Sequence, residues 1–198
     1  MKRLLIIAPW LADFGHGILL TILFSSLFDV EPTFIYFVLG IVFSVLPDFD
    51  GAKEFFRYNG KVDAGEHGDH RDGLHYPVMW LIVGMVLVLF YPFIGTLFIA
   101  CTMMHFINDS WGTGWGVEWL WPFNGRSYKF FSRNNVDADV TLQSLVTSWG
   151  SEEKNETAQR LGNRSWLQHL YGQITIISGI EYGTFVVALI TLAWYIAL

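Results

Sequence analysis

The chain has 198 residues, of which 53% are hydrophobic and only 15% charged, whereas soluble domains average about 25% charged residues. This composition indicates a membrane protein, and the net charge of −6 excludes the broad basic surface that nucleic-acid binding needs. The single cysteine, Cys101, excludes a disulfide framework and a thiolate metal cluster.

Five apolar stretches are candidates for membrane-spanning helices, because a span needs roughly 20 apolar residues, or fewer when its ends lie at the interface. In chain order they are about Leu11–Phe28, Pro32–Leu46, Pro77–Phe90, Phe93–Ile107 and Ile174–Leu198. No small-residue cleavage site follows the basic start of the chain, so we expect a retained first span and not a removed signal peptide. The sequence predicts an all-α, polytopic integral membrane protein with about five transmembrane helices, folded as a single domain over residues 1–198.

Five spans would leave two long loops, residues 48–76 and 108–173, on the same side of the membrane as the N-terminus. All twelve Lys and Arg residues fall on that side. Cytoplasmic loops carry an excess of Lys and Arg, so we expect the N-terminus and both loops to be cytoplasmic and the chain to lie in the inner (plasma) membrane. Within the second loop, the segments 137–149 and 155–171 are typical of short amphipathic helices. The tryptophan-rich stretch 111–123 fits an aromatic belt at the headgroup level or a lid over a pocket.

Histidines and aspartates gather where the predicted helices meet the two loops. In chain order they are His16, Asp48, Asp50, His70, His75, His105 and Asp109. His105 and Asp109 are four residues apart, so they share one helix face about one turn apart. Ionisable groups at membrane depth are costly and usually face a cavity or a partner. We therefore expect a metal site at the cytoplasmic helix ends, and a chance clustering of ordinary loop residues is the competing interpretation.

Imidazole and carboxylate ligands together suit Zn²⁺, Mn²⁺ or Fe²⁺ better than Ca²⁺ or Mg²⁺, and we expect Zn²⁺. Seven candidate ligands exceed one tetrahedral shell. Either two or more ions bind, or some of these groups orient ligands or take part in catalysis. Paired metal ions about 3.5–4 Å apart can hold both the attacking and the leaving oxygen of a phosphoester.

Four short motifs give the chain a resemblance to a known family. They are "LPDFD" at 46–50, "HRDGLH" at 70–75, "HFIND" at 105–109 and "WP" at 121–122. With the early His16, their order and spacing resemble the LexA-regulated, membrane-bound metal-dependent hydrolase family (YdjM-like), over about residues 15–123. Leu74 and Tyr76 stand where that family tends to have Thr and Ser, and Gly112 where it tends to have Thr. Hydroxyl groups expected at these points are therefore missing, unless Thr113 or Tyr76 substitutes for them.

The resemblance implies a hydrolase, and the spacing of His105 and Asp109 is also similar to that of zinc-dependent phospholipase C enzymes. We expect a phosphoesterase that uses metal-activated water on a lipid or lipid-linked substrate at the headgroup level. Asp48 or Asp50 is the candidate to bridge metals or to accept the proton of that water. Arg71 is the candidate to hold a phosphate oxygen, with a simple membrane anchor as the alternative.

Two other functions fit the same residues. One is transport of a divalent metal, and the other is a membrane scaffold that metal stabilises without catalysis. Glu181 lies about two turns into the last predicted span, where a buried acid is a candidate functional residue.

Overall fold

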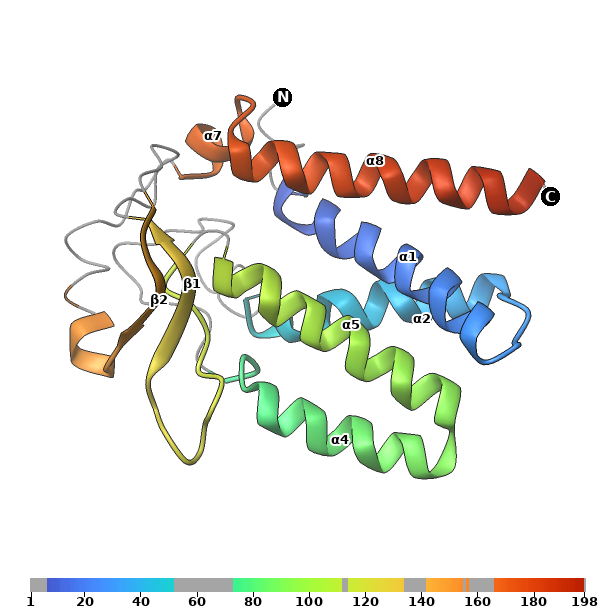
Figure 1. Cartoon of the computed structure of the whole chain (residues 1–198), viewed down its shortest axis with the longest axis horizontal. Coiled ribbons are helices and arrows are strands. Elements are labelled where there is room, and N and C mark those ends of the chain that lie inside the picture. Colours follow the sequence, from blue (N-terminus) through green and yellow to red (C-terminus); the bar gives the residue numbers. More distant parts are fainter. Residues whose placement is uncertain are drawn as a thin grey trace. The chain divides into compact units, whose positions relative to one another are not determined.

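A computed structural model describes residues 7–51, 73–111, 114–133, 142–154, 156 and 166–197. Most of these residues are helical (Figure 1). The helices are α1 (Leu11–Leu27), α2 (Phe34–Val45), α4 (Pro77–Phe90), α5 (Pro92–Trp111), α7 (Trp166–Tyr171) and α8 (Ile176–Ala197), and short 3-10 helices precede α1 (Ala8–Trp10) and follow α2 (Leu46–Asp48). Two strands, β1 (Ser127–Arg133) and β2 (Leu142–Trp149), pair in an antiparallel hairpin. The prediction of an all-α fold is therefore correct only for the greater part of the described chain.

Three of the described helices are long and apolar enough to cross a bilayer, namely Ala8–Leu27, Phe34–Gly51 and Ile176–Ala197. They coincide with the first, second and fifth predicted spans. The third and fourth predicted spans also form helices, as α4 and α5, but α4 has only 14 residues. Length and composition thus support three of the five predicted spans.

One compact unit holds the chain up to Pro47, together with Met79–His105 and Gly179–Leu198. Within it, two glycines bring α1 into close contact with its neighbours. A Cβ atom added at Gly17 would lie 2.6 Å from the carbonyl oxygen of Gly40 on α2. One added at Gly15 would lie 3.1 Å from the Cα of Phe185 on α8. Small residues allow this close approach of helix backbones, as they do at helix crossings in membranes.

The apolar core of this unit lies where α5 meets α1 and α2. Phe93, Leu97 and Cys101 are its buried residues, and the ring centroids of Phe93 and Tyr36 are 4.9 Å apart. Cys101 is thus a small buried apolar side chain, as expected for a lone cysteine in an apolar run. Many apolar side chains of α4 and α8 are instead exposed, which suits helices that face lipid.

The second unit comprises Asp48–Val78 and Phe106–Ser178, of which the hairpin is part. Phe130 pairs with Val146 in the hairpin, and Val117 extends the ladder by pairing with Tyr128. Gly116 makes that contact possible, because its φ is +84° and a Cβ atom there would collide with the Tyr128 carbonyl.

The amphipathic helix predicted over 137–149 is wrong, because Leu142–Trp149 forms strand β2. Pairing with the earlier strand Ser127–Arg133 decides the conformation of this segment, and helical periodicity does not indicate such a partner. Of the second predicted helix, over 155–171, the structure describes Trp166–Tyr171 as the helix α7.

Candidate metal centre

The imidazole of His75 is completely buried and is surrounded by three carboxylates. Its Nδ1 lies 3.0 Å from Oδ2 of Asp50. Its Nε2 lies 3.4 Å from Oδ1 of Asp48 and 3.2 Å from Oδ2 of Asp109. These side chains come from the turn after α2, the residues before α4 and the last turn of α5. Three segments that are distant in the sequence therefore contact one another at this ring.

Asp50 is fixed by hydrogen bonds on both of its oxygens. Oδ1 accepts a hydrogen bond of 2.7 Å from the Gly51 N–H, and Oδ2 accepts one of 3.0 Å from the Leu74 N–H. The same Oδ2 lies 3.0 Å from Nδ1 of His75. Asp50 thus holds the loop before α4 and orients the imidazole, with Nε2 directed toward Asp48 and Asp109.

The two nitrogens of the His75 ring differ in the number of carboxylates that they face: Nδ1 faces one and Nε2 faces two. Burial lowers the pKa of His75, but hydrogen bonds to Asp109, Asp48 and Asp50 raise it by more, so that the pKa lies well above its usual value of 6.5. A protonated Nε2 carries one hydrogen, yet two carboxylates face it. A metal ion in place of that hydrogen would contact the imidazole and both carboxylates at once, so this side of the ring fits a cation.

A second histidine completes a group with the donor set of a metal site. Asp48, His75, His105 and Asp109 each offer one ligand atom, and these four atoms lie within 4.8 Å of one another. His105 is 2% exposed and lies one turn before Asp109 on the continuous helix α5. Two imidazoles and two carboxylates suit Zn²⁺, Mn²⁺ or Fe²⁺. The group is able to hold a metal ion, and it contains four of the seven predicted ligands.

The other predicted site residues have different positions. Asp50 contacts His75 but is not one of the four residues of the metal-binding group. His16 lies on α1, partly buried, and its Nδ1 has no hydrogen-bond partner among the described residues. Glu181 is buried on α8. His70 and Arg71 lie outside the described residues.

Asp13 is a further residue of interest that the sequence motifs do not include. It lies in the first turn of α1 and is 3% exposed, and its Oδ2 is 3.4 Å from Nδ1 of His105. The available signal was an acid inside an otherwise apolar span, three residues before His16. Buried acids in such spans are candidate functional residues.

Two tryptophans pack against the residues that follow the metal-binding side chains. The indole N–H of Trp119 donates a 2.8 Å hydrogen bond to Oγ of Ser110, which is adjacent to Asp109. Trp121 stacks on Tyr76, which is adjacent to His75, with ring centroids 4.3 Å apart. This part of the tryptophan-rich stretch therefore braces the elements that carry the site.

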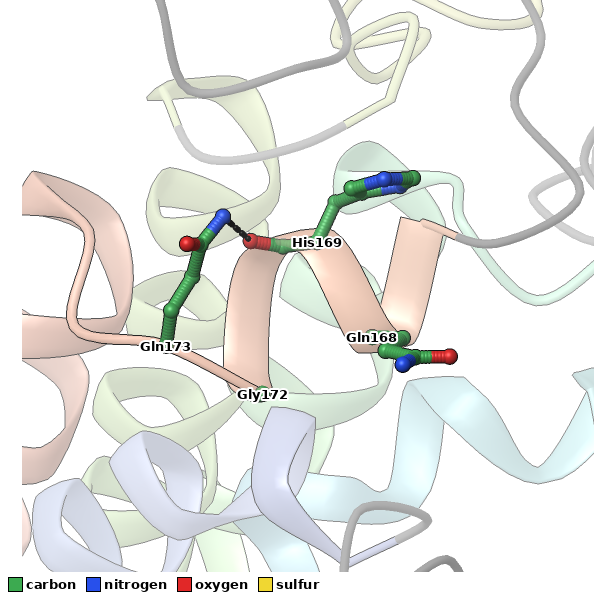
Figure 2. Close-up of a pocket in the computed structure, with 4 residues that line it drawn as sticks. All are labelled: Gln168, His169, Gly172 and Gln173. Carbon is green, nitrogen blue, oxygen red and sulfur yellow. Dashed lines mark hydrogen bonds between the residues drawn. The ribbon is translucent and has the colours of Figure 1, made fainter.

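A pocket lies near the end of α7 (Figure 2). It measures about 340 Å³ and is lined by Gln168, His169, Gly172 and Gln173. The Gln173 amide donates a 3.0 Å hydrogen bond to the backbone carbonyl of His169, as Figure 2 shows. None of these four lining residues belongs to the metal-binding group.

Comparison with known protein families identifies the family to which the chain belongs. The family model described as YdjM inner membrane protein matches residues 12–197, so the similarity extends well beyond the motifs between residues 15 and 123. No curated protein and no solved structure shows a significant match to the chain.

Proposed function

We propose that this chain, which belongs to the YdjM inner membrane protein family, is a metal-dependent hydrolase that cleaves a phosphoester of a lipid or lipid-linked substrate. The observation that carries the proposal is the position of His75, buried between Asp48, Asp50 and Asp109. Burying so many ionisable groups is costly unless they are paired or coordinate a metal. A bound cation is the simplest compensation for this arrangement.

Four side chains would hold the metal, namely Asp48, His75, His105 and Asp109. A bound divalent ion would supply polarisation of a phosphoryl oxygen and a water whose pKa is lowered toward about 7. His16 and His70 remain candidates for a second ion, as the family motifs suggest. Zn²⁺ is the ion that we expect first, with Mn²⁺ or Fe²⁺ as alternatives.

The carboxylates have separate tasks in this proposal. Both oxygens of Asp50 already accept hydrogen bonds, so we assign Asp50 to orienting His75. Asp48 offers one oxygen to the metal, and its side chain is 18% exposed, so its other oxygen is the better candidate to accept a proton from an attacking water. Arg71 would hold a phosphate oxygen of the substrate with its forked donors.

The membrane setting favours a lipid substrate. The candidate spans place the protein in the bilayer, and the metal-binding residues lie at or beyond helix ends, just after α2, just before α4 and in the last turns of α5. Phosphoester bonds of lipids lie at the headgroup level, where helix ends emerge. This reasoning supports a lipid or lipid-linked phosphoester over a freely soluble one.

The first test is metal content, measured by mass spectrometry on full-length protein purified in detergent. We expect wild type to carry zinc or manganese at one or more ions per chain and His75→Ala to lose it. His169→Ala is the matched control, because His169 is an exposed histidine on α7. Wild type that folds but takes up no Zn²⁺ or Mn²⁺ on soaking would exclude the proposal.

Hydrolysis is tested next, by screening phosphoester lipids in mixed micelles with the metal-loaded protein. We expect Asp48→Asn to keep the fold and lose turnover. A scaffold would show metal-dependent stability with no turnover on any phosphoester. A transporter would move the divalent ion across proteoliposomes, and either result would replace the hydrolase proposal.

A further inference from the structure

We propose that Asp13 is a positioning residue that orients His105 through Nδ1 and so directs Nε2 toward the metal-binding group. The inference rests on the metal site proposed above and adds a residue that lies outside the motifs at 46–50, 70–75 and 105–109. Its structural basis is the 3.4 Å approach of Asp13 Oδ2 to Nδ1 of His105.

The burial of Asp13 requires a reason that helix formation does not give. An acid in the first turn of a helix interacts favourably with the helix dipole, but an exposed acid has this interaction too, so the dipole does not require burial. Asp13 is instead 3% exposed within a candidate membrane span. Its Oδ1 is buried with no hydrogen-bond partner among the described residues, so the carboxylate is held at a cost.

The two histidines of the metal-binding group share one arrangement. His75 has the carboxylate of Asp50 on its Nδ1 side, at 3.0 Å. His105 has the carboxylate of Asp13 on its Nδ1 side, at 3.4 Å. The His75–Asp50 contact meets hydrogen-bond criteria, whereas the His105–Asp13 contact is an ion-pair approach. In our proposal each carboxylate favours the hydrogen on Nδ1 and leaves Nε2 as the metal ligand. Histidines that bind metals almost always donate their other N–H to such a partner, which also makes the ligating nitrogen more basic.

The contact with His105 also explains why an acid is placed on α1. Asp13 on α1 and His105 on α5 belong to the same compact unit, which includes α5 as far as His105. The pair therefore ties the orientation of a metal ligand to the packing of the membrane helices. Removing the carboxylate should leave that packing in place and release the ring.

The test measures Zn²⁺ affinity of the full-length protein in detergent, by competition with a chelator, for Asp13→Ala and Asp13→Asn. We expect Asp13→Ala to bind Zn²⁺ about 10- to 100-fold more weakly than wild type. Asp13→Asn should lose less, because an amide oxygen still accepts a hydrogen bond from Nδ1. Ser25→Ala is the matched control, because Ser25 is a buried polar residue on the same helix, and its affinity should be unchanged.

Two further measurements separate positioning from simple stability. The unfolding temperature with chelator present should be similar in wild type and Asp13→Asn, and the visible spectrum of the Co²⁺-loaded protein should change when His105 is released. Wild-type Zn²⁺ affinity in both Asp13 variants would overturn this inference and leave the metal site intact. A wild type that binds no metal would overturn the metal site itself, and this inference with it.

Discussion

The Oδ2 oxygen of Asp109 lies 3.2 Å from Nε2 of His75, which joins the last turn of α5 to the residues that precede α4. The contact is buried on the histidine side, and Asp48 approaches the same nitrogen. Two acids directed at one imidazole nitrogen repel each other unless a positive charge lies between them. This relationship leads to predictions about metal binding, about pH and about the segments that hold the site.

Asp109→Asn should weaken Zn²⁺ binding by at least about tenfold, because the amide keeps the shape of the ligand and removes its charge. The unfolding temperature of the metal-free protein should also fall, since Asp109 is the first of the three hydrogen-bond partners that raise the pKa of His75 and stabilise its protonated form. Chelator competition and thermal unfolding in detergent measure the two effects. Asp29→Asn, at an exposed acid between α1 and α2, is the control. Unchanged Zn²⁺ affinity in Asp109→Asn would remove Asp109 from the ligand set.

The stability of the metal-free protein should depend on pH through His75. The pKa of His75 is raised in the folded state, so its protonation stabilises the fold fully below the unfolded-state pKa near 6.5. That stabilisation is lost as the pH rises through the higher folded-state value. We expect the unfolding temperature of chelator-treated protein to fall as the pH is raised above 6.5.

Metal should reverse this pH dependence, because a metal ion and a proton compete for Nε2 of His75. Zn²⁺ added at high pH should restore the unfolding temperature, and its affinity should fall as the pH is lowered. His75→Gln should lack the part of the pH dependence that wild type shows above pH 6.5. An identical pH profile in His75→Gln and wild type would assign the effect to other groups.

Trp119→Phe should destabilise the protein by about 1 kcal/mol, because it removes the hydrogen bond from the indole N–H to Ser110 and keeps an aromatic ring. Zn²⁺ affinity should fall with it, since Ser110 is adjacent to Asp109. The effect should be largely absent when Ser110→Ala is already present, which a double-mutant cycle in thermal unfolding measures. Trp194→Phe, at an exposed tryptophan on α8, is the control and should change neither quantity.

Gly17→Ala should cost about 1–3 kcal/mol, because the added methyl group would lie 2.6 Å from the Gly40 carbonyl oxygen and force α1 away from α2. The folded yield and the unfolding temperature in detergent both report this loss. Gly183→Ala is the matched control, because a Cβ atom there meets nothing within 4 Å, and it should be neutral or slightly stabilising. Equal behaviour of the two variants would mean that the close contact of α1 and α2 is not required.

The sequence alone predicts the three candidate membrane spans and the four residues of the group that is able to hold a metal ion. Long apolar runs report burial or lipid contact directly, so α1, α2 and α8 fall where predicted. The spacing of His105 and Asp109 reports a shared helix face, which α5 confirms. These features depend on residues that are near one another in the chain.

The tertiary structure decides what depends on distant residues. The strand at Leu142–Trp149 requires its partner Ser127–Arg133, and hydropathy periodicity does not indicate that pairing. The difference between Asp48 and Asp50 is also invisible in "PDFD", because it depends on which nitrogen of His75 each acid faces. The contact of Asp13 with His105 joins residues 92 positions apart, as the two residue numbers show. Composition and local spacing therefore determined the membrane class and the candidate ligand types. Only packing between segments determined which side chains meet, because the distances between side chains are set by the folded chain and not by their separation along it.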